Sequence, residues 1–128
     1  MLAGSGELEK ELKELSSSLN LNDKIIFLGH REDIGDLLNA SDGFILSSLS
    51  EAMPMSLLEA GSFGLTLVGS NVGGIPEVIK NKEFLFEPRD FTSLAKIMDK
   101  QNRLSSKDLI NNNFTNEVVT KKYLELYF

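Results

Sequence analysis

Two glutamates, eight positions apart, are the residues of this chain best placed to do chemistry. Glu59 lies in a nearly uncharged, apolar segment that continues to Val68, where a carboxylate is costly to bury unless it is hydrogen-bonded. Glu51 comes shortly before Pro54, a residue suited to opening a helix. The spacing predicts one acid at the mouth of a helix and a second about two turns further on. Such a site suits a ligand with hydroxyl groups whose phosphate rests on the helix N-terminus.

On spacing alone, other interpretations of this pair stay open. Glu51 and Glu59 could be the two carboxylates of a glycosidase, or Glu51 could cap the helix while Glu59 faces solvent. Met55 and Phe63 lie one turn before and one turn after Glu59, so its stripe on the helix is apolar. This pattern favours a ligand role, and we expect the Glu59 carboxylate to be shielded from water.

The order of the elements predicts an α/β fold. Short apolar runs indicate strands over residues 24–28, 43–46, 65–68 and 84–86, and the first of these strands is expected to be buried. Helical spacing of apolar residues predicts helices over 7–19, 34–40, 54–63, 76–79, 91–101 and 105–128, with Asp33 available as the cap of the second. Because strands alternate with helices, we expect a Rossmann-like parallel sheet flanked by helices.

Loops that follow the strands are the candidate ligand-binding segments, because ligands bind at the carboxyl ends of parallel strands. The segments 29–31, 47–54 and 70–74 each follow a predicted strand, so we expect them at one edge of the sheet. Gly73-Gly74 could form a backbone nest for an anion or a plain turn. The sequence alone does not separate these two roles.

Two polar features near glycines are weaker signals. His30 and Arg31 follow the first long apolar run, but Arg31 could simply pair with Glu32 or Asp33 at the surface. Gly4-Ser5-Gly6 resembles the start of a dinucleotide-binding turn. The third glycine of that motif is replaced by an acidic residue that would oppose a pyrophosphate, so we expect no cofactor there.

Composition excludes several classes of function. A length of 128 residues indicates one domain, and a net charge of −6 argues against nucleic acid as a partner. The chain has no cysteine and a single histidine, so neither thiolate chemistry nor a multi-histidine metal cluster is expected. No apolar run has the length of a membrane span and no signal peptide is recognisable, so a cytoplasmic location is expected.

The first residues bear on how much of the fold is present. Leu2-Ala3 has the character of the end of a strand, although strands usually have about five residues. We therefore expect upstream strands of the fold to be missing, with residues 1–128 forming a single domain truncated at its N-terminus.

A series of short motifs follows in a fixed order. In chain order they are Gly4-Ser5-Gly6-Glu7, Ile26-Phe27-Leu28-Gly29, Ala40-Ser41-Asp42-Gly43-Phe44-Ile45-Leu46-Ser47-Ser48, Glu51-Ala52-Met53-Pro54-Met55-Ser56-Leu57-Leu58-Glu59-Ala60, Gly64-Leu65-Thr66-Leu67-Val68 and Val72-Gly73-Gly74-Ile75-Pro76-Glu77-Val78-Ile79. This order and spacing resemble the C-terminal, donor-binding lobe of family 4 glycosyltransferases, which have the GT-B fold. The resemblance is clear from Gly4 to about Asp90 and looser to Phe128.

The resemblance implies a role for each matching residue. In that family the first glutamate of the E-x7-E element faces the transferred sugar, which is Glu51 here, and the second binds the ribose, which is Glu59. The implied reaction transfers a sugar from a nucleotide donor with retained anomeric configuration, without a cofactor or a required metal. The other implied donor-binding residues are Gly29, His30, Arg31, Ala52, Met53 and Pro54.

Departures from the family pattern set further expectations. Ala52 stands where the family usually has glycine, and it would be strained if that position needs a positive φ. The upstream Arg and Lys that grip the diphosphate, and the lobe that binds the acceptor, are not in this chain. We therefore expect the chain to be inactive in isolation, to need an N-terminal lobe or partner chain, and to be prone to self-association.

Two other classes of function stay open beside the transferase. One is a non-catalytic module that binds a nucleotide sugar, and the other is one lobe of a nucleotide-sugar epimerase, which shares the two-lobe fold. The complete transferase is expected to act in polysaccharide or glycolipid assembly, with peripheral contact at the inner face of the membrane.

Overall fold

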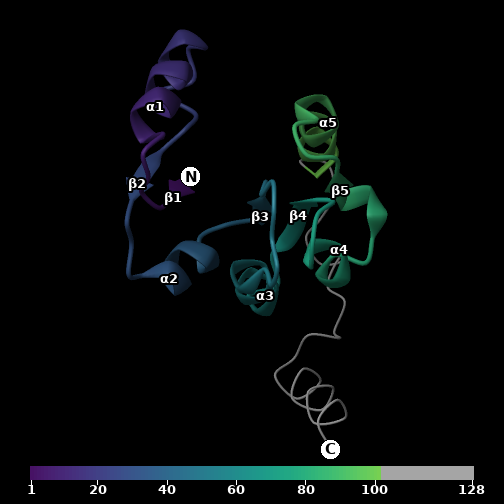
Figure 1. The fold of residues 1–128 in the computed structure, drawn as a ribbon. Coiled ribbons are helices and arrows are strands. Elements are labelled where there is room, and N and C mark those ends of the chain that lie inside the picture. Colours follow the sequence, from purple (N-terminus) through teal and green to yellow (C-terminus); the bar gives the residue numbers. More distant parts are fainter. Residues whose placement is uncertain (102–128) are drawn as a thin grey trace, which may run out of the picture. The chain divides into compact units, whose positions relative to one another are not determined.

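The computed structural model describes residues 1–101 (Figure 1). The helix predicted at 105–128 lies outside the described residues. The chain divides into two compact units, Met1–Leu37 and a second that begins at Leu38. The expectation of one single domain stays a prediction.

A two-stranded parallel sheet and one long helix form the first unit. Strand β1 (Leu2–Ala3) pairs with β2 (Phe27–Gly29), and helix α1 (Glu9–Ser18) connects them. Helix α2 (Ile34–Asn39) then crosses the boundary between the units. The short β1 confirms the strand expected at Leu2-Ala3.

The strand predicted at 24–28 is shorter and begins later than expected. The backbone amides of Lys24 and Ile25 both donate to the Leu21 carbonyl, which places them in a turn rather than in the strand. The prediction that this strand is buried was also wrong, because β2 is only half-buried and Ile26 before it is 55% exposed.

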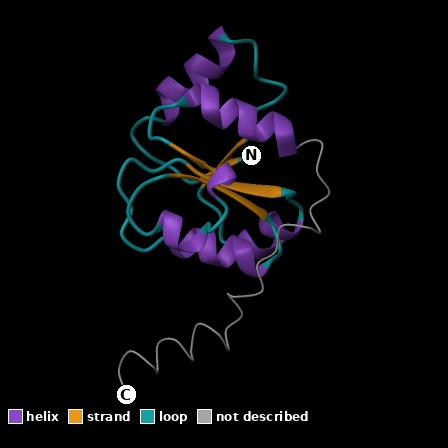
Figure 2. Cartoon of the chain, turned by 90° about the vertical axis from the view of Figure 1, so that its right-hand side faces the viewer, coloured by secondary structure: helices purple, strands orange, loops and turns teal. Residues whose placement is uncertain are grey.

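The second unit is built on a three-stranded parallel sheet. Its elements are β3 (Gly43–Leu46), α3 (Met55–Ser62), β4 (Thr66–Ser70), α4 (Ile75–Val78), a 3₁₀ helix (Lys82–Phe84), β5 (Leu85–Phe86) and α5 (Phe91–Gln101). The strand order is β3-β4-β5, with Gly43 opposite Thr66 and Leu46 opposite Gly69. Helix α5 lies on one side of this sheet and α3 and α4 on the other (Figure 1). Figure 2 distinguishes the helices, strands and loops by colour.

Central strand β4 organises the core of the second unit. The buried apolar cluster consists of Leu57, Val68, Ile75, Ile79, Phe84 and Phe86. Strand β4 extends two residues beyond the predicted 65–68, because Gly69 and Ser70 pair with Leu85 and Phe86 of β5. The loops after β3 and β4 therefore begin at the end of a sheet that is packed against the core.

Two boundaries in this unit show how local hydrogen bonds decide the ends of elements. The strand predicted at 84–86 loses Phe84 to the 3₁₀ helix, which begins where the Asn81 side chain accepts a hydrogen bond from the Glu83 amide. Helix α3 ends as predicted before Gly64, which has φ +75° and so suits the turn after a helix.

Apolar side chains line the exposed face of α1. Leu8, Leu12, Leu15 and Leu19 recur at the predicted helical spacing and are each about half exposed. The helices of residues 1–101 are short, and none of them is long and apolar enough to cross a membrane.

Asp90 caps the N-terminus of α5 and gives a prediction for stability against pH. Its carboxylate accepts hydrogen bonds from the Ser93 hydroxyl at 2.6 Å and the Ser93 amide at 2.9 Å. These bonds, the hydroxyl first, lower the pKa of Asp90. A lowered pKa in the folded state contributes stability above the unfolded pKa of about 3.9, and that stability is lost as the pH falls through the folded value.

We therefore expect Asp90→Ala to have a lower Tm at pH 7 and a smaller further loss of Tm on acidification than the parent chain. Thermal unfolding followed by circular dichroism at neutral and acidic pH measures both effects. Asp90→Asn keeps a capping acceptor and should retain most of the Tm at pH 7. An Asp90→Ala variant with an unchanged Tm would show that this cap contributes nothing.

Candidate functional site

Three loops were predicted to share the carboxyl edge of the sheet. The two that follow β3 and β4 lie together there. The Ser70 hydroxyl donates a 2.6 Å hydrogen bond to the Ser48 carbonyl. Four residues further on, the Gly74 amide donates to the Glu51 carbonyl at 3.3 Å. The segment that carries Glu51 is thus fixed against the end of β4 and the turn that follows it.

Glycine is required twice in that turn because the two backbones approach closely. Gly73 has φ +51°, and a Cβ there would lie 1.5 Å from the Glu51 carbonyl oxygen. At Gly74 a Cβ would lie 2.5 Å from the Ala52 carbonyl oxygen. The Gly74 amide already donates to Glu51, so this pair serves close packing rather than an open nest of amides for an anion.

Glu51 itself lies at the mouth of α3, as predicted. Its side chain is half-buried, and one carboxylate oxygen accepts a long hydrogen bond of 3.4 Å from the Ser48 hydroxyl. Its backbone carbonyl is held by Gly74. The backbone that carries this carboxylate is therefore held by hydrogen bonds at Ser48 and at Glu51 itself.

Glu59 is exposed, so the expectation that it would be shielded from water was wrong. Helix α3 turns Leu57 and Ala60 toward the sheet, and both are fully buried. The stripe of Glu59 faces the other way, as the 67% exposure of Met55 shows. An apolar stripe thus did not mean a buried one, and the Glu59 carboxylate is accessible to a ligand without loss of core packing.

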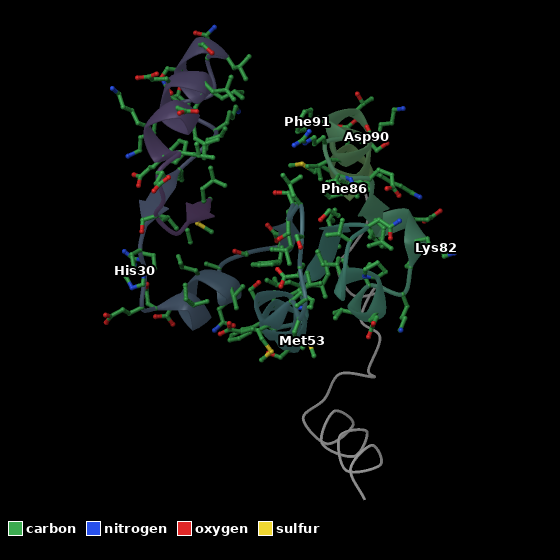
Figure 3. All side chains as sticks on the ribbon, viewed as in Figure 1. His30, Met53, Lys82, Phe86, Asp90 and Phe91 are labelled. Atoms are coloured by element: carbon green, nitrogen blue, oxygen red, sulfur yellow. The ribbon has the colours of Figure 1, made fainter. Side chains whose placement is uncertain are left out.

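Backbone amides are available where the loop enters α3. Ala52 and Met53 are exposed while Pro54 is buried, and the Met53 side chain extends outward next to α3 (Figure 3). Within residues 1–101, the amides of Ala52 and Met53 donate no hydrogen bond. Such amides at a helix N-terminus suit an anion, because the helix dipole adds to their partial charge.

Ala52 adopts an ordinary backbone conformation. The non-glycine residues of positive φ in the described part of the chain are Asn20 and Arg89. Ala52 therefore carries no strain from a positive φ, and its methyl group is exposed at the mouth of α3.

The loop at 29–31 belongs to the first unit, so its place beside the other two loops stays a prediction. Gly29 ends β2 with φ +64°, and the His30 side chain is exposed (Figure 3). The Arg31 guanidinium donates to Asp33 through Nε at 2.8 Å and through a second nitrogen. This contact raises the pKa of Arg31 and lowers that of Asp33. The surface pairing considered from the sequence is confirmed, and the Asp33 carboxylate binds Arg31.

Ser48 and Ser70 are residues that the sequence reasoning did not single out. Ser70 is fully buried, although a serine at the end of a strand gives no sign of burial in the sequence. Its position just after the predicted strand, three residues before Gly73, is the one signal that could have indicated a role.

Comparisons with known proteins show the family of the chain. The family model described as "Glycosyl transferases group 1" matches residues 1–115. The chain is 35% identical to the Escherichia coli UDP-Gal:alpha-D-GlcNAc-diphosphoundecaprenol alpha-1,3-galactosyltransferase, over 93% of this chain and 32% of that protein. It is 36% identical to the Bacillus anthracis N-acetyl-alpha-D-glucosaminyl L-malate synthase, over 74% of this chain and 26% of that protein.

Solved structures show the same fold. Anabaena Alr3699/HepE in complex with UDP has a TM-score of 0.82 and 24% identity, and the chain covers 39% of it. The lipopolysaccharide outer core galactosyltransferase WaaB has a TM-score of 0.81 and 18% identity, again with 39% covered. The predicted Rossmann-like fold of a GT-B glycosyltransferase is thereby confirmed, and the chain spans about a third of the length of the relatives it matches. The chain belongs to the family of group 1 glycosyl transferases.

Proposed function

We propose that this chain is the donor-binding lobe of a retaining glycosyltransferase that moves a sugar from a nucleotide donor to a lipid or glycan acceptor. The observation that carries the proposal is the arrangement around α3 in a member of this family. Glu51 and the amides of Ala52 and Met53, which donate no hydrogen bond within residues 1–101, lie at the mouth of the helix, and the exposed carboxylate of Glu59 lies two turns further along.

Each part of that arrangement matches one part of a nucleotide sugar. Amides at the N-terminus of α3 suit the diphosphate, whose leaving charge is stabilised by such fixed dipoles. Glu51 is placed to accept hydrogen bonds from the sugar hydroxyls. Glu59 is placed to accept them from the ribose, in charge-assisted bonds that are stronger than neutral ones.

Uridine nucleotides are the first donors to test. The Escherichia coli relative carries UDP-Gal in its name, and the Anabaena structure contains UDP. Because the chain spans about a third of such relatives, the acceptor site belongs to the rest of the complete enzyme. The chain alone is proposed to bind the donor without transferring the sugar, and the complete enzyme to work in the cytoplasm at a lipid-linked acceptor.

Calorimetric titration of the chain with UDP, GDP and ADP tests this proposal. One nucleotide should bind, and Glu59→Ala should weaken it by about tenfold or more, because a hydrogen bond to a charged group contributes about 1.5–3 kcal/mol. Glu14→Ala, which removes an exposed carboxylate from α1, should bind as the parent chain does. Equal affinity of the parent and the Glu59→Ala variant would contradict the role given to Glu59.

A further inference from the structure

Ser70 is a buried hydroxyl that the donor chemistry does not use. It ends β4, its exposed fraction is 0%, and its side chain lies between two carbonyls of the neighbouring chain segment. The hydroxyl donates to the Ser48 carbonyl at 2.6 Å and lies 3.5 Å from the Leu46 carbonyl. The shorter contact is a strong hydrogen bond by its length, and the longer one is marginal.

The contact at Ser48 leads directly to Glu51. Ser48 is bound through its carbonyl to Ser70, and its own hydroxyl donates to the Glu51 carboxylate at 3.4 Å. On the far side, the Gly74 amide holds the Glu51 carbonyl. Ser70 and Gly74 both belong to the end of β4 and its turn, so one segment holds the backbone before Glu51 and the backbone of Glu51 itself.

From this chain of contacts we infer that Ser70 and Ser48 are positioning residues that set the Glu51 carboxylate toward the donor sugar. The role of the donor sugar rests on the proposed function, whereas the contacts among Ser70, Ser48 and Glu51 do not. Ser70 acts through the Ser48 backbone and touches no substrate. The Ser70 hydroxyl is needed because the Ser48 carbonyl would otherwise pack against a buried side chain without a hydrogen-bond donor, which costs free energy.

The two serines should affect the binding of the donor sugar but not the binding of the nucleotide. Glu59 lies on α3 and has no hydrogen bond to either serine among the described residues, so contacts with the ribose do not depend on them. Loss of the serine hydroxyls should weaken a nucleotide sugar relative to the bare nucleotide. A general loss of structure would weaken both equally.

Binding of UDP is compared with binding of UDP-galactose, UDP-glucose and UDP-N-acetylglucosamine, using the sugar nucleotide that the parent chain binds best. Ser48→Ala should weaken the sugar nucleotide by about threefold to tenfold and leave UDP unchanged, which is the range for one hydrogen bond weakened by its length of 3.4 Å. Ser48→Thr keeps the hydroxyl and should restore the affinity. Ser50→Ala, at an exposed position of the same loop, is the matched control.

Hydrogen exchange of the Gly74 amide, followed by NMR without ligand, tests the contacts independently of the donor. Ser70→Ala should speed this exchange by about tenfold, because the loop that carries the Glu51 acceptor is released. Ser50→Ala should leave it unchanged. If no nucleotide binds the parent chain, the proposed function fails, while faster Gly74 exchange in Ser70→Ala still supports the positioning contacts.

Two results would overturn the inference. The first is a Gly74 exchange rate that is the same in Ser70→Ala and in the parent chain. The second is an equal loss of affinity for UDP and for the sugar nucleotide in Ser48→Ala, since only a structural role predicts that.

Discussion

Gly73→Ala is expected to destabilise the second unit by about 3 kcal/mol or more and to remove nucleotide binding. The new Cβ would lie 1.5 Å from the Glu51 carbonyl oxygen, in a residue whose φ is +51°. Both the overlap and the backbone strain must be relieved, and the atoms nearest to the new Cβ are the backbone atoms of Glu51. Urea unfolding and calorimetric titration measure the two effects.

Gly6→Ala is the matched control for this prediction. No atom lies within 4 Å of a Cβ built at Gly6, and its φ is not positive. Its stability should stay close to that of the parent chain, as for most surface substitutions. A Gly73→Ala variant as stable as Gly6→Ala would show that the turn after β4 does not pack on Glu51.

Leu57→Ala should have the second large effect, a loss of about 2–5 kcal/mol. Leu57 is fully buried and packs in the core with Val68 and Ile75, so its removal leaves a cavity between α3 and the sheet. Because α3 carries the amides at its mouth and Glu59, the variant should also bind nucleotide more weakly. Urea unfolding gives the free energy, and titration at a temperature where the variant is folded gives the affinity.

Met55→Ala provides the comparison on the same helix. Met55 is 67% exposed, so truncation should change the stability by no more than about 0.5 kcal/mol. Similar losses for the Leu57 and Met55 variants would contradict the described orientation of α3, since that orientation is what buries one side chain and exposes the other.

The sequence predicted those elements whose local signals and tertiary packing agree. Strand Gly43–Leu46 has the predicted bounds and helix α5 begins at the predicted Phe91, because the chain bends at Asp42 before the strand and the Asp90 cap precedes the helix. The strand predicted at 24–28 begins only at Phe27, because Lys24 and Ile25 form a turn with Leu21. An apolar run shows that a segment can be a strand, but not where its hydrogen-bond partners lie.

The sequence predicted which residues form the candidate site better than it predicted how buried they are. Glu51 at the mouth of α3 follows from the motif and the nearby proline. The exposure of Glu59 does not, because which side of α3 faces the sheet depends on how Leu57 packs in the core. The burial of Ser70 could not be predicted from the sequence, because it results from contact with Ser48, a residue 22 positions away.

The central claim, that the Glu59 carboxylate holds the ribose of a nucleotide donor, is tested most directly by a double-mutant cycle in calorimetry. UDP and 2′,3′-dideoxyuridine diphosphate are each titrated into the parent chain and into Glu59→Gln. If Glu59 binds the ribose, the parent chain should prefer UDP by about tenfold and Glu59→Gln should lose most of this preference. A preference for UDP that is equally large in both chains would contradict it.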